Sequence, residues 1–464
     1  MMNLARRSCE AALRVRRTAV RPFWSVLGMA LLATGVLTAY AEDNPLREFF
    51  PYGVYAHGAN PEVVPPAEGE GMQDVMDRVC KDLADHHMNC VWTTNLGFAT
   101  LPLWLEGGRK NGVRIVPQGG GPPAFVRPSW FKDKEDLARR VEPFYQDMAE
   151  KHRDDPALLA WSVTEENRPV PWFLEAVADL TLKMAEWDPK HPMITMDNRA
   201  PSAWMNAQVI KPKSITRDLY VFFTDGLNGP YNATGARSAL TRECKRFRTA
   251  ADSCGAVFWF IGQGMSIVNY GGGRHHSMYR YPTPEEIRWQ VWATIQQGAK
   301  GFFYFMYVGR RGDPTPDFKG EYIEGLRDRN GEETPQFRMA AQVGEEIAPL
   351  MPVLLDLDVA PPHREVVYWE NTPVSGQTFV HRKTGKRFLI VVNHDCNNIQ
   401  PIGIELGYWP RLLDKEESLF DLRSGQKRDY QTLKLATLLP GDGTVFFVGT
   451  PEEWGAFAQD FYAR

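Results

Sequence analysis

Two adjacent glutamates, Glu165 and Glu166, follow an apolar run that begins at Leu158. The run has the composition of a buried parallel strand, and the end of a barrel strand is where catalytic groups stand. Apolar neighbours raise the pKa of a carboxyl group at such a place, so that it donates a proton near neutral pH. The alternative is a solvated pair that opens the loop before Pro169.

The elements that would position these acids are alternating strands and helices between residues 50 and 352. The predicted strands are 50–57, 89–95, 113–118, 158–166, 193–197, 218–224, 256–263 and 301–308. The predicted helices are 73–87, 101–110, 134–152, 173–187, 202–210, 235–251, 284–297 and 335–351. This α/β pattern predicts a (β/α)8 TIM barrel. A doubly wound open sheet is the alternative, but no G-x-G-x-x-G motif follows an early strand.

The pattern of predicted secondary structure changes after Pro361 and Pro362. Short strand patterns broken by turns cover 366–369, 377–381, 387–393, 403–406, 417–421 and 444–448. They predict a C-terminal antiparallel β-sandwich domain. The predicted domains are therefore the barrel at 42–352 and the β-sandwich at 353–464.

The first 41 residues have the features of a signal peptide. A head with six arginines precedes an apolar stretch from Phe23 to Thr38, and the tripeptide 39–41, Ala-Tyr-Ala, fits a cleavage site. We predict cleavage before Glu42 and export to the periplasm or the extracellular space. The alternative is an uncleaved anchor, because the apolar stretch is almost long enough to span a membrane.

Charge and cysteine content restrict the partners. The segment 1–41 holds six arginines and one acid, Glu10, so its removal changes the formal net charge from −4 to −9. An acidic chain without a basic run does not suit nucleic acid or anionic membranes, so we expect neither nucleic-acid binding nor membrane insertion after cleavage. The residue pattern indicates no oligomeric state.

Five cysteines follow the predicted cleavage site, an odd number that prevents complete pairing. Cys80 with Cys90, and Cys244 with Cys254, are each ten residues apart and form either disulfides or buried thiols. Neither a zinc-type spacing nor a phosphate loop is present, and we expect no metal and no cofactor.

Polar residues at the predicted strand ends, together with aromatic residues of the strands, give a candidate binding site at the barrel mouth. Hydroxyl groups need short polar partners and a pyranose face needs an aromatic ring, so this set suits a carbohydrate. The predicted substrate-binding residues are His57, Trp92, Asn95, Gln118, Trp161, Asp197, Trp259, Gln263 and Tyr307. Helix or loop capping is the alternative role, above all for Asp197.

Residues 159–167 read Leu-Ala-Trp-Ser-Val-Thr-Glu-Glu-Asn and resemble the fourth-strand motif of clan A glycoside hydrolases, in which a Trp-led strand ends in Asn-Glu-Pro or Asp-Glu-Pro. The general acid/base of that motif falls on Glu166, and Glu165 takes the place of the Asn or Asp. A barrel with a terminal β-domain is also similar to divergent secreted β-galactosidase-like hydrolases. The resemblance implies hydrolysis of O-glycosidic bonds in a poly- or oligosaccharide.

The seventh strand departs from that family, whose nucleophile is a Glu at its end, because Gln263 stands there. An amide has no anionic oxygen, whereas hydrolysis needs two carboxyl groups about 5–5.5 Å apart for retention or about 6.5–9.5 Å apart for inversion. In the glycosidase hypothesis, Asp225 or Glu165 supplies the second carboxylate beside Glu166. The alternatives are a protein that binds glycans without cleaving them and a barrel enzyme of unrelated chemistry.

Overall fold

The computed structural model describes residues 44–57, 68–96, 100–119, 128–166, 169–224, 233–269, 276–309, 321–328, 330–360, 373–402, 413, 416–429 and 436–463. The predicted signal peptide, Asp225 and the predicted strands 366–369 and 403–406 fall outside these residues. Within these ranges, no helix combines the length and the apolar character that a membrane crossing requires.

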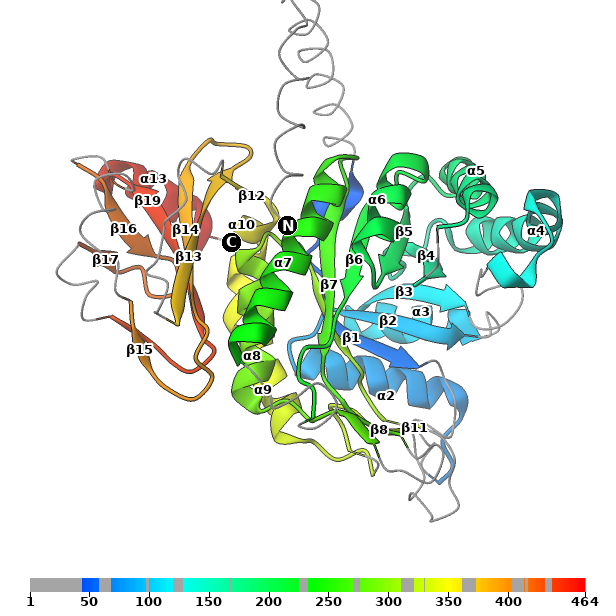
Figure 1. Ribbon diagram of the computed structural model, residues 1–464, viewed down its shortest axis with the longest axis horizontal. Coiled ribbons are helices and arrows are strands. Elements are labelled where there is room, and N and C mark those ends of the chain that lie inside the picture. Colours follow the sequence, from blue (N-terminus) through cyan, green and yellow to red (C-terminus); the bar gives the residue numbers. More distant parts are fainter. Residues whose placement is uncertain are drawn as a thin grey trace, which may run out of the picture. The chain divides into compact units, whose positions relative to one another are not determined.

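Eight parallel strands of the described chain close into a barrel, which confirms the predicted fold class (Figure 1). In chain order they are β1 (Tyr52–His57), β2 (Cys90–Leu96), β3 (Arg114–Gly119), β4 (Trp161–Glu165), β5 (Met193–Asp197), β6 (Ser214–Asp218), β7 (Val257–Gln263) and β10 (Phe302–Phe305). Each strand pairs with its neighbour in this series, and β10 closes the barrel onto β1.

A helix follows each barrel strand. These helices are α2 (Met72–Asp85), α3 (Leu101–Asn111), α4 (Lys134–His152), α5 (Pro171–Trp187), α6 (Ala200–Val209), α7 (Ala233–Asp252), α8 (Pro284–Gln296) and α9 (Pro335–Ile347). Local sequence starts several of them: Thr283 caps α8 and forms a capping box with Glu286, and Thr334 caps α9. Most predicted helix bounds agree with these to within two residues.

The sixth strand was predicted at the wrong residues. The prediction placed it at 218–224, whereas β6 spans Ser214–Asp218. Residues 219–223 are rich in aromatic and aliphatic side chains, which favours a strand by composition, but they leave the barrel. The true strand is more polar, yet β5 and β7 cover both of its edges. As a result, Asp218 ends the strand at the barrel mouth instead of beginning it.

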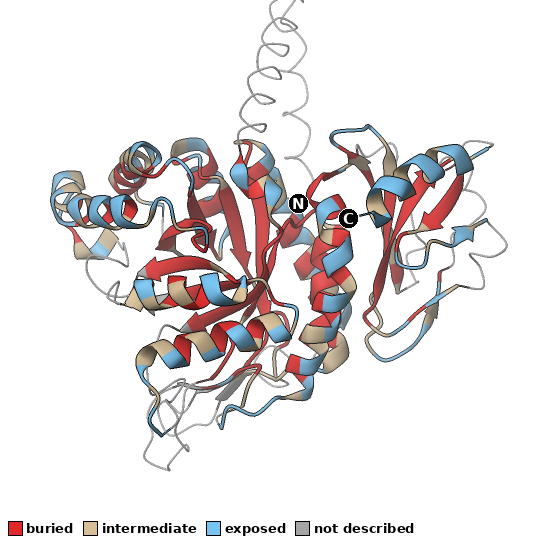
Figure 2. Ribbon diagram, turned by 180° about the vertical axis from the view of Figure 1, so that it is seen from behind, coloured by how far each residue is buried: buried red, intermediate tan, exposed pale blue. Residues whose placement is uncertain are grey.

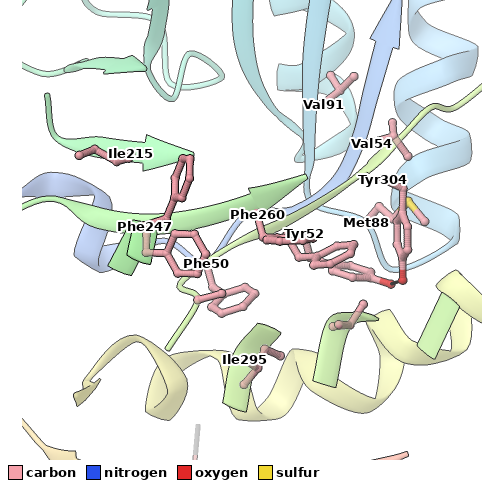
Figure 3. Packing of buried hydrophobic residues seen from close by; sticks show 14 of the residues in the cluster. Phe50, Tyr52, Val54, Met88, Val91, Ile215, Phe247, Phe260, Ile295 and Tyr304 are labelled. Atoms are coloured by element: carbon pink, nitrogen blue, oxygen red, sulfur yellow. Dashed lines mark hydrogen bonds between the residues drawn. The ribbon is translucent and has the colours of Figure 1, made fainter. Parts of the chain in front are cut away.

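Two apolar layers hold the barrel together, and the strands are buried almost throughout (Figure 2). The inner layer fills the barrel and includes Trp92, Trp259 and Phe303. The outer layer lies between the strands and the helices (Figure 3). Figure 3 shows part of this outer layer, in which the hydroxyl groups of Tyr52 and Tyr304 lie 3.1 Å apart.

A small antiparallel sheet is formed by the segments that follow β7 and β10. It consists of β8 (Ser266–Asn269), β9 (His276–Tyr279) and β11 (Glu321–Glu324), in the order β11-β8-β9. Its chain returns to the segment after β6, because Thr224 N donates to Met278 O over 3.4 Å. The sheet therefore stands beside the part of the mouth to which β6 and β7 lead.

The C-terminal part is an antiparallel β-domain. Its six-stranded sheet has the order β12-β13-β14-β19-β16-β17, and a second sheet pairs β15 with β18. The strands are β12 (Leu357–Val359), β13 (Val374–His381), β14 (Arg387–Asn393), β15 (Gln400–Pro401), β16 (Ser418–Asp421), β17 (Lys427–Arg428), β18 (Thr437–Leu438) and β19 (Gly443–Gly449). The two sheets are consistent with the predicted sandwich. A terminal helix, α13 (Pro451–Tyr462), packs on Phe420 and Phe447 through Trp454.

Helix α8 contacts both the barrel and the β-domain. Toward the β-domain, Trp289 Nε1 donates to His394 Nδ1 over 2.9 Å, and Gln296 Nε2 donates to Ser375 O over 2.8 Å. Every residue from Glu286 to Gln296 is buried. A helix enclosed in this way is rigidly held, and it backs the end of β7.

Candidate active site

Strands β1, β3 and β4 bring Tyr55, Gln118 and Glu165 together at the mouth. Gln118 Nε2 donates to Glu165 Oε2 over 2.8 Å, and Tyr55 Oη donates toward Glu165 Oε1 over 3.0 Å. Trp92 Nε1 donates to Gln118 Oε1 over 2.8 Å. Because an indole N–H can only donate, it directs the oxygen of the Gln118 amide to Trp92 and the nitrogen to Glu165. Glu165 is thus held as an acceptor on both oxygens.

Both glutamates face the mouth because the backbone of β4 is irregular. The pairing of β4 with β5 shifts register between Ser162 and Thr164, and such a bulge reverses the alternation of the following side chains. Glu165 therefore points into the barrel. Glu166 has a φ of 49°, in the left-handed region, where a non-glycine residue breaks the strand pattern. Its side chain is exposed and contacts Asp218.

Asp218, at the end of β6, is the second carboxyl group of the site. Burial raises the pKa of Asp218 well above its usual range, and the charge of Glu166 and a hydrogen bond with Glu166 raise it further. A hydrogen bond from the Tyr220 hydroxyl acts in the opposite direction. Two carboxyl groups in contact cannot both ionise freely, and burial together with this contact favours the protonated form of Asp218.

One carboxyl oxygen of Asp218 lacks a hydrogen bond to the described residues. Oδ1 is buried and has no hydrogen-bond partner among the described residues. A buried polar atom without a partner is costly, by about 1–3 kcal/mol. Functional sites are a common place for such an atom, because a bound ligand completes its hydrogen bonding.

Aromatic rings surround the carboxyl groups. Phe305 stacks on Tyr220 with ring centroids 5.4 Å apart, and it lies 5.5 Å from Tyr55. Tyr279, on β9, meets Tyr220 edge to face at 5.5 Å. Burial raises the pKa of the Tyr55 and Tyr220 hydroxyls, as do the charges of Glu165 and Asp218 respectively, so both remain protonated donors. These side chains therefore offer apolar ring faces and, at the ends of Tyr55 and Tyr220, hydroxyl groups that can form hydrogen bonds.

Gln263, at the end of β7, is fully buried and engaged with the backbone. Its Nε2 donates to Phe222 O, Met265 O and Arg280 O over 3.3, 3.2 and 2.8 Å, and its Oε1 accepts from Phe222 N over 2.9 Å. These bonds leave neither amide hydrogen for a ligand. The geometry therefore gives no support to a substrate contact by Gln263.

Four other predicted binding residues have their polar contacts or packing outside the carboxyl pair, although the charge of Glu166 adds to the raised pKa of one of them, Asp197. Trp161 packs in the outer layer and its Nε1 donates to Asp188 over 2.8 Å. Trp259 is buried in the inner layer, four residues before the end of β7. Tyr307 donates to Asp82 on α2, outside the barrel. Asp197 accepts from Asn206 on α6 over 2.7 Å, and burial raises the pKa of Asp197 to about 7.

Of the remaining candidates, the structure assembles Glu165, Glu166, Gln118 and Trp92. The side chains of His57 and Asn95 fall outside the described part, although their backbones end β1 and β2. Asp225 is not among the described residues either. The roles of these three residues stay predictions.

Three members of the site, Asp218, Tyr220 and Tyr55, were not predicted. Asp218 and Tyr220 were not recognised because the sixth strand was predicted at 218–224, which places Asp218 at its start and Tyr220 inside it. In a strand at Ser214–Asp218, the period of two places Asp218 on the same face as Ser214 and Thr216, opposite Ile215 and Arg217. Tyr55 was passed over because a tyrosine within a strand is most simply read as core.

Cysteines and metal ligands add no chemistry to the described part of the site. All five described cysteines are free thiols, which decides against the disulfides Cys80–Cys90 and Cys244–Cys254. Among the described residues, no group of three or more His, Cys, Asp or Glu side chains is arranged to hold a metal ion.

The closed barrel and the carboxyl pair at its mouth define a (β/α)8-barrel protein whose acids stand where barrel enzymes carry their active sites. No protein-family model matches the sequence, and no curated protein matches it significantly. Similar solved structures include the β-glucuronidase from Ruminococcus gnavus in complex with D-glucuronic acid, with 14% identity and a TM-score of 0.47. A polyextremophilic β-galactosidase from the Antarctic haloarchaeon Halorubrum lacusprofundi matches with 16% identity and a TM-score of 0.48.

These matches are partial on both sides. The first covers 64% of this chain and 49% of the glucuronidase chain, and the second covers 65% and 58%. The matched region thus spans about half the length of the glucuronidase. Identities and TM-scores of this size are too low to transfer an activity.

Proposed function

We propose that the protein is a glycoside hydrolase whose catalytic pair is Asp218 and Glu166. The observation that carries the proposal is the contact between the buried Asp218 carboxyl and the exposed Glu166 carboxyl at the barrel mouth. The sequence predicted Asp225 or Glu165 as the second carboxylate, and we propose Asp218 for that role. We further propose that the barrel, predicted at 42–352, carries the activity, and that the chain is exported through the segment 1–41.

Hydrolysis of a glycoside needs a proton on the leaving oxygen and a carboxylate that stabilises the oxocarbenium-like transition state or activates water. We assign the proton to Asp218, whose buried Oδ1 atom has no hydrogen-bond partner among the described residues, and the carboxylate to Glu166. This assignment differs from the acid/base role that the fourth-strand motif implies for Glu166. The two groups are closer than either known separation, so substrate must part them, and Glu166 is the exposed member that turns away.

The surroundings of the pair support a carbohydrate as the substrate. Glu165, Gln118 and Tyr55 form a rigid polar group that can accept and donate hydrogen bonds to sugar hydroxyls. The rings of Phe305 and Tyr220 offer the apolar faces that a pyranose ring stacks against. We therefore place the substrate among poly- or oligosaccharides with O-glycosidic bonds.

The test compares native protein with Glu166→Gln and Asp218→Asn on a panel of glycans. Both variants should lose hydrolysis by about 10²–10⁴-fold, the usual contribution of a positioned acid or base. Asp197→Asn is the matched control, because Asp197 is also a buried carboxyl group but bonds to Asn206 on the outer side of the barrel. It should keep the native rate to within about threefold. Native rates in both site variants would exclude the pair.

A protein that binds glycans without cleaving them is the second candidate. The observation that favours it is Gln263, an amide where the resembling hydrolases carry their nucleophile. Saturable glycan binding by the native protein, with no release of reducing sugar, is the result that separates it from the hydrolase.

A further inference from the structure

The Gln263 side chain continues the pairing of β6 and β7 beyond the point where the strands part. The backbone ladder ends at Asp218 and Ile261. Further along, Gln263 Oε1 accepts from Phe222 N over 2.9 Å and Gln263 Nε2 donates to Phe222 O over 3.3 Å. A side-chain amide that binds both backbone groups of Phe222 acts as a neighbouring strand residue would act.

The same amide joins two more segments to this point. Nε2 also donates to Met265 O, just before β8, and to Arg280 O, just after β9. Behind it, Gln290 on α8 accepts from Gln263 N over 2.7 Å and donates to Gln263 O over 2.9 Å. Two buried glutamines in series therefore fix the strand end to the rigid helix.

The segment that Gln263 holds, residues 218–222, includes Tyr220, which is a neighbour of Asp218. Residues 218–222 leave the barrel at Asp218 and are fastened again at Phe222. Tyr220 lies between these points, hydrogen-bonded to Asp218 and stacked on Phe305. Arg280 N also donates to Phe222 O over 3.1 Å, and because Gln263 Nε2 bonds to Arg280 O as well, Gln263 supports both segments that hold Tyr220 on Asp218.

We propose that Gln263 is a positioning residue that sets the protonation of Asp218 by holding Tyr220 against it. Its activity readout rests on the proposed function, but its effect on Asp218 does not. The position that resembles a nucleophile thus acts through the backbone of the neighbouring segment, without touching substrate.

The experiment compares Gln263→Glu with Gln296→Glu. In the first variant a carboxylate oxygen replaces the amide nitrogen that faces three carbonyl oxygens, and like partners repel. Gln296 is the matched control, since its Nε2 also donates to two buried carbonyls, those of Ser375 and Ile390, at the β-domain side of α8. Both substitutions place a carboxylate against backbone carbonyl oxygens, but only Gln263 lies at the barrel mouth.

Two readouts are taken below the melting temperature of each variant. The first is the titration of the Asp218 carboxyl carbon by ¹³C NMR, with Asp218→Asn identifying the resonance. The second is kcat and KM on a cleaved glycoside. We expect Gln263→Glu to shift the Asp218 titration and to lower kcat on the order of 100-fold with KM nearly unchanged, as misplacement of a catalytic group does. Gln296→Glu should keep the native titration and kcat.

Identical titration and kcat in the two variants would overturn the proposal, and so would a gain of hydrolysis in Gln263→Glu. If Gln263→Glu does not fold, Gln263→Met decides by the same readouts, because it removes the Phe222 bonds without adding charge. If Gln263→Glu shifts the Asp218 titration but the native protein cleaves no glycoside, only the proposed function is contradicted. If the native protein cleaves a glycoside but the Gln263 variants leave the Asp218 titration unshifted, only the positioning role is contradicted.

Discussion

Asp218 and Glu166 are hydrogen-bonded to each other across the mouth of the barrel, although β5 stands between their strands. Two irregularities make the contact: the bulge in β4 and the left-handed backbone of Glu166. The contact raises the pKa of the buried Asp218 carboxyl, because its ionisation would place a second negative charge beside Glu166.

The pH dependence of hydrolysis should report the protonation of Asp218. Asp218 donates the proton, so kcat/KM should fall as pH rises through the raised pKa of Asp218, well above the usual aspartate range near about 4. The measurement is kcat/KM of the native protein from acid to alkaline pH. An alkaline limb at the ordinary aspartate pKa would contradict the assignment of the proton to Asp218.

Asp197 should make the stability of the fold pH-dependent. Burial raises the pKa of Asp197 to about 7 from 3.8, so the folded state holds the proton more tightly than the unfolded state. Its contribution is complete below about pH 4 and is lost as pH rises through about 7, by at most about 4 kcal/mol.

Asp197→Asn keeps an acceptor for Asn206 but does not titrate. The free energy of unfolding, variant minus native, should therefore increase between pH 4 and pH 8 in urea titrations. A difference that is flat over this range would mean that Asp197 is ionised at little cost in the folded protein.

Removal of the Glu165 carboxylate should destabilise the fold more than its conversion to an amide. Glu165→Ala leaves the Gln118 amide buried without this acceptor, at a cost of roughly 1–3 kcal/mol, whereas the Tyr55 hydroxyl still has Gln118 Oε1 as an acceptor 2.9 Å away. Glu165→Gln keeps an oxygen for Gln118 and should cost less. The check is the midpoint of chemical denaturation, and equal midpoints for the two variants would show that the hydrogen bonds carry no net stability.

The cysteines should behave as protected thiols. Burial raises the pKa of the Cys80 thiol to about 12 and that of Cys90 well above its usual range, so little reactive thiolate forms. A chain that begins at Glu42 should release five thiols to a disulfide reagent after denaturation without reductant, and react slowly when folded. A count of three or fewer would reveal a disulfide that the structure does not contain.

Much of the fold could be predicted from hydrophobic periodicity, because strands of a parallel barrel are buried on both faces and read as apolar runs. Arg387–Asn393 and Met193–Asp197 were found at their true bounds. The polar strand β6 was missed for the same reason, since its paired edges, and not its composition, make it a strand. The final helix was missed although Thr450 and Glu453 form a readable capping box.

The site was predictable only where a side chain and its strand end coincide, as at Glu165 and Gln118. Contacts that depend on a bulge or on a left-handed residue are set by backbone geometry, which composition does not record. Gln263 illustrates the limit. Its place at the strand end was predicted, but its bonds go to the backbones of Phe222, Met265 and Arg280, which meet only in the folded chain.

The most direct test of the catalytic pair is the hydrolysis of two aryl glycosides by Asp218→Asn, one with an acidic phenol as leaving group and one with a basic phenol. An acidic phenol departs without a proton, so the variant should cleave it at close to the native rate and cleave the other about 10²–10⁴-fold more slowly. Glu166→Gln should be slow on both. Native-like cleavage of the basic phenol by Asp218→Asn would contradict the account, because Asp218 would then not be the proton donor.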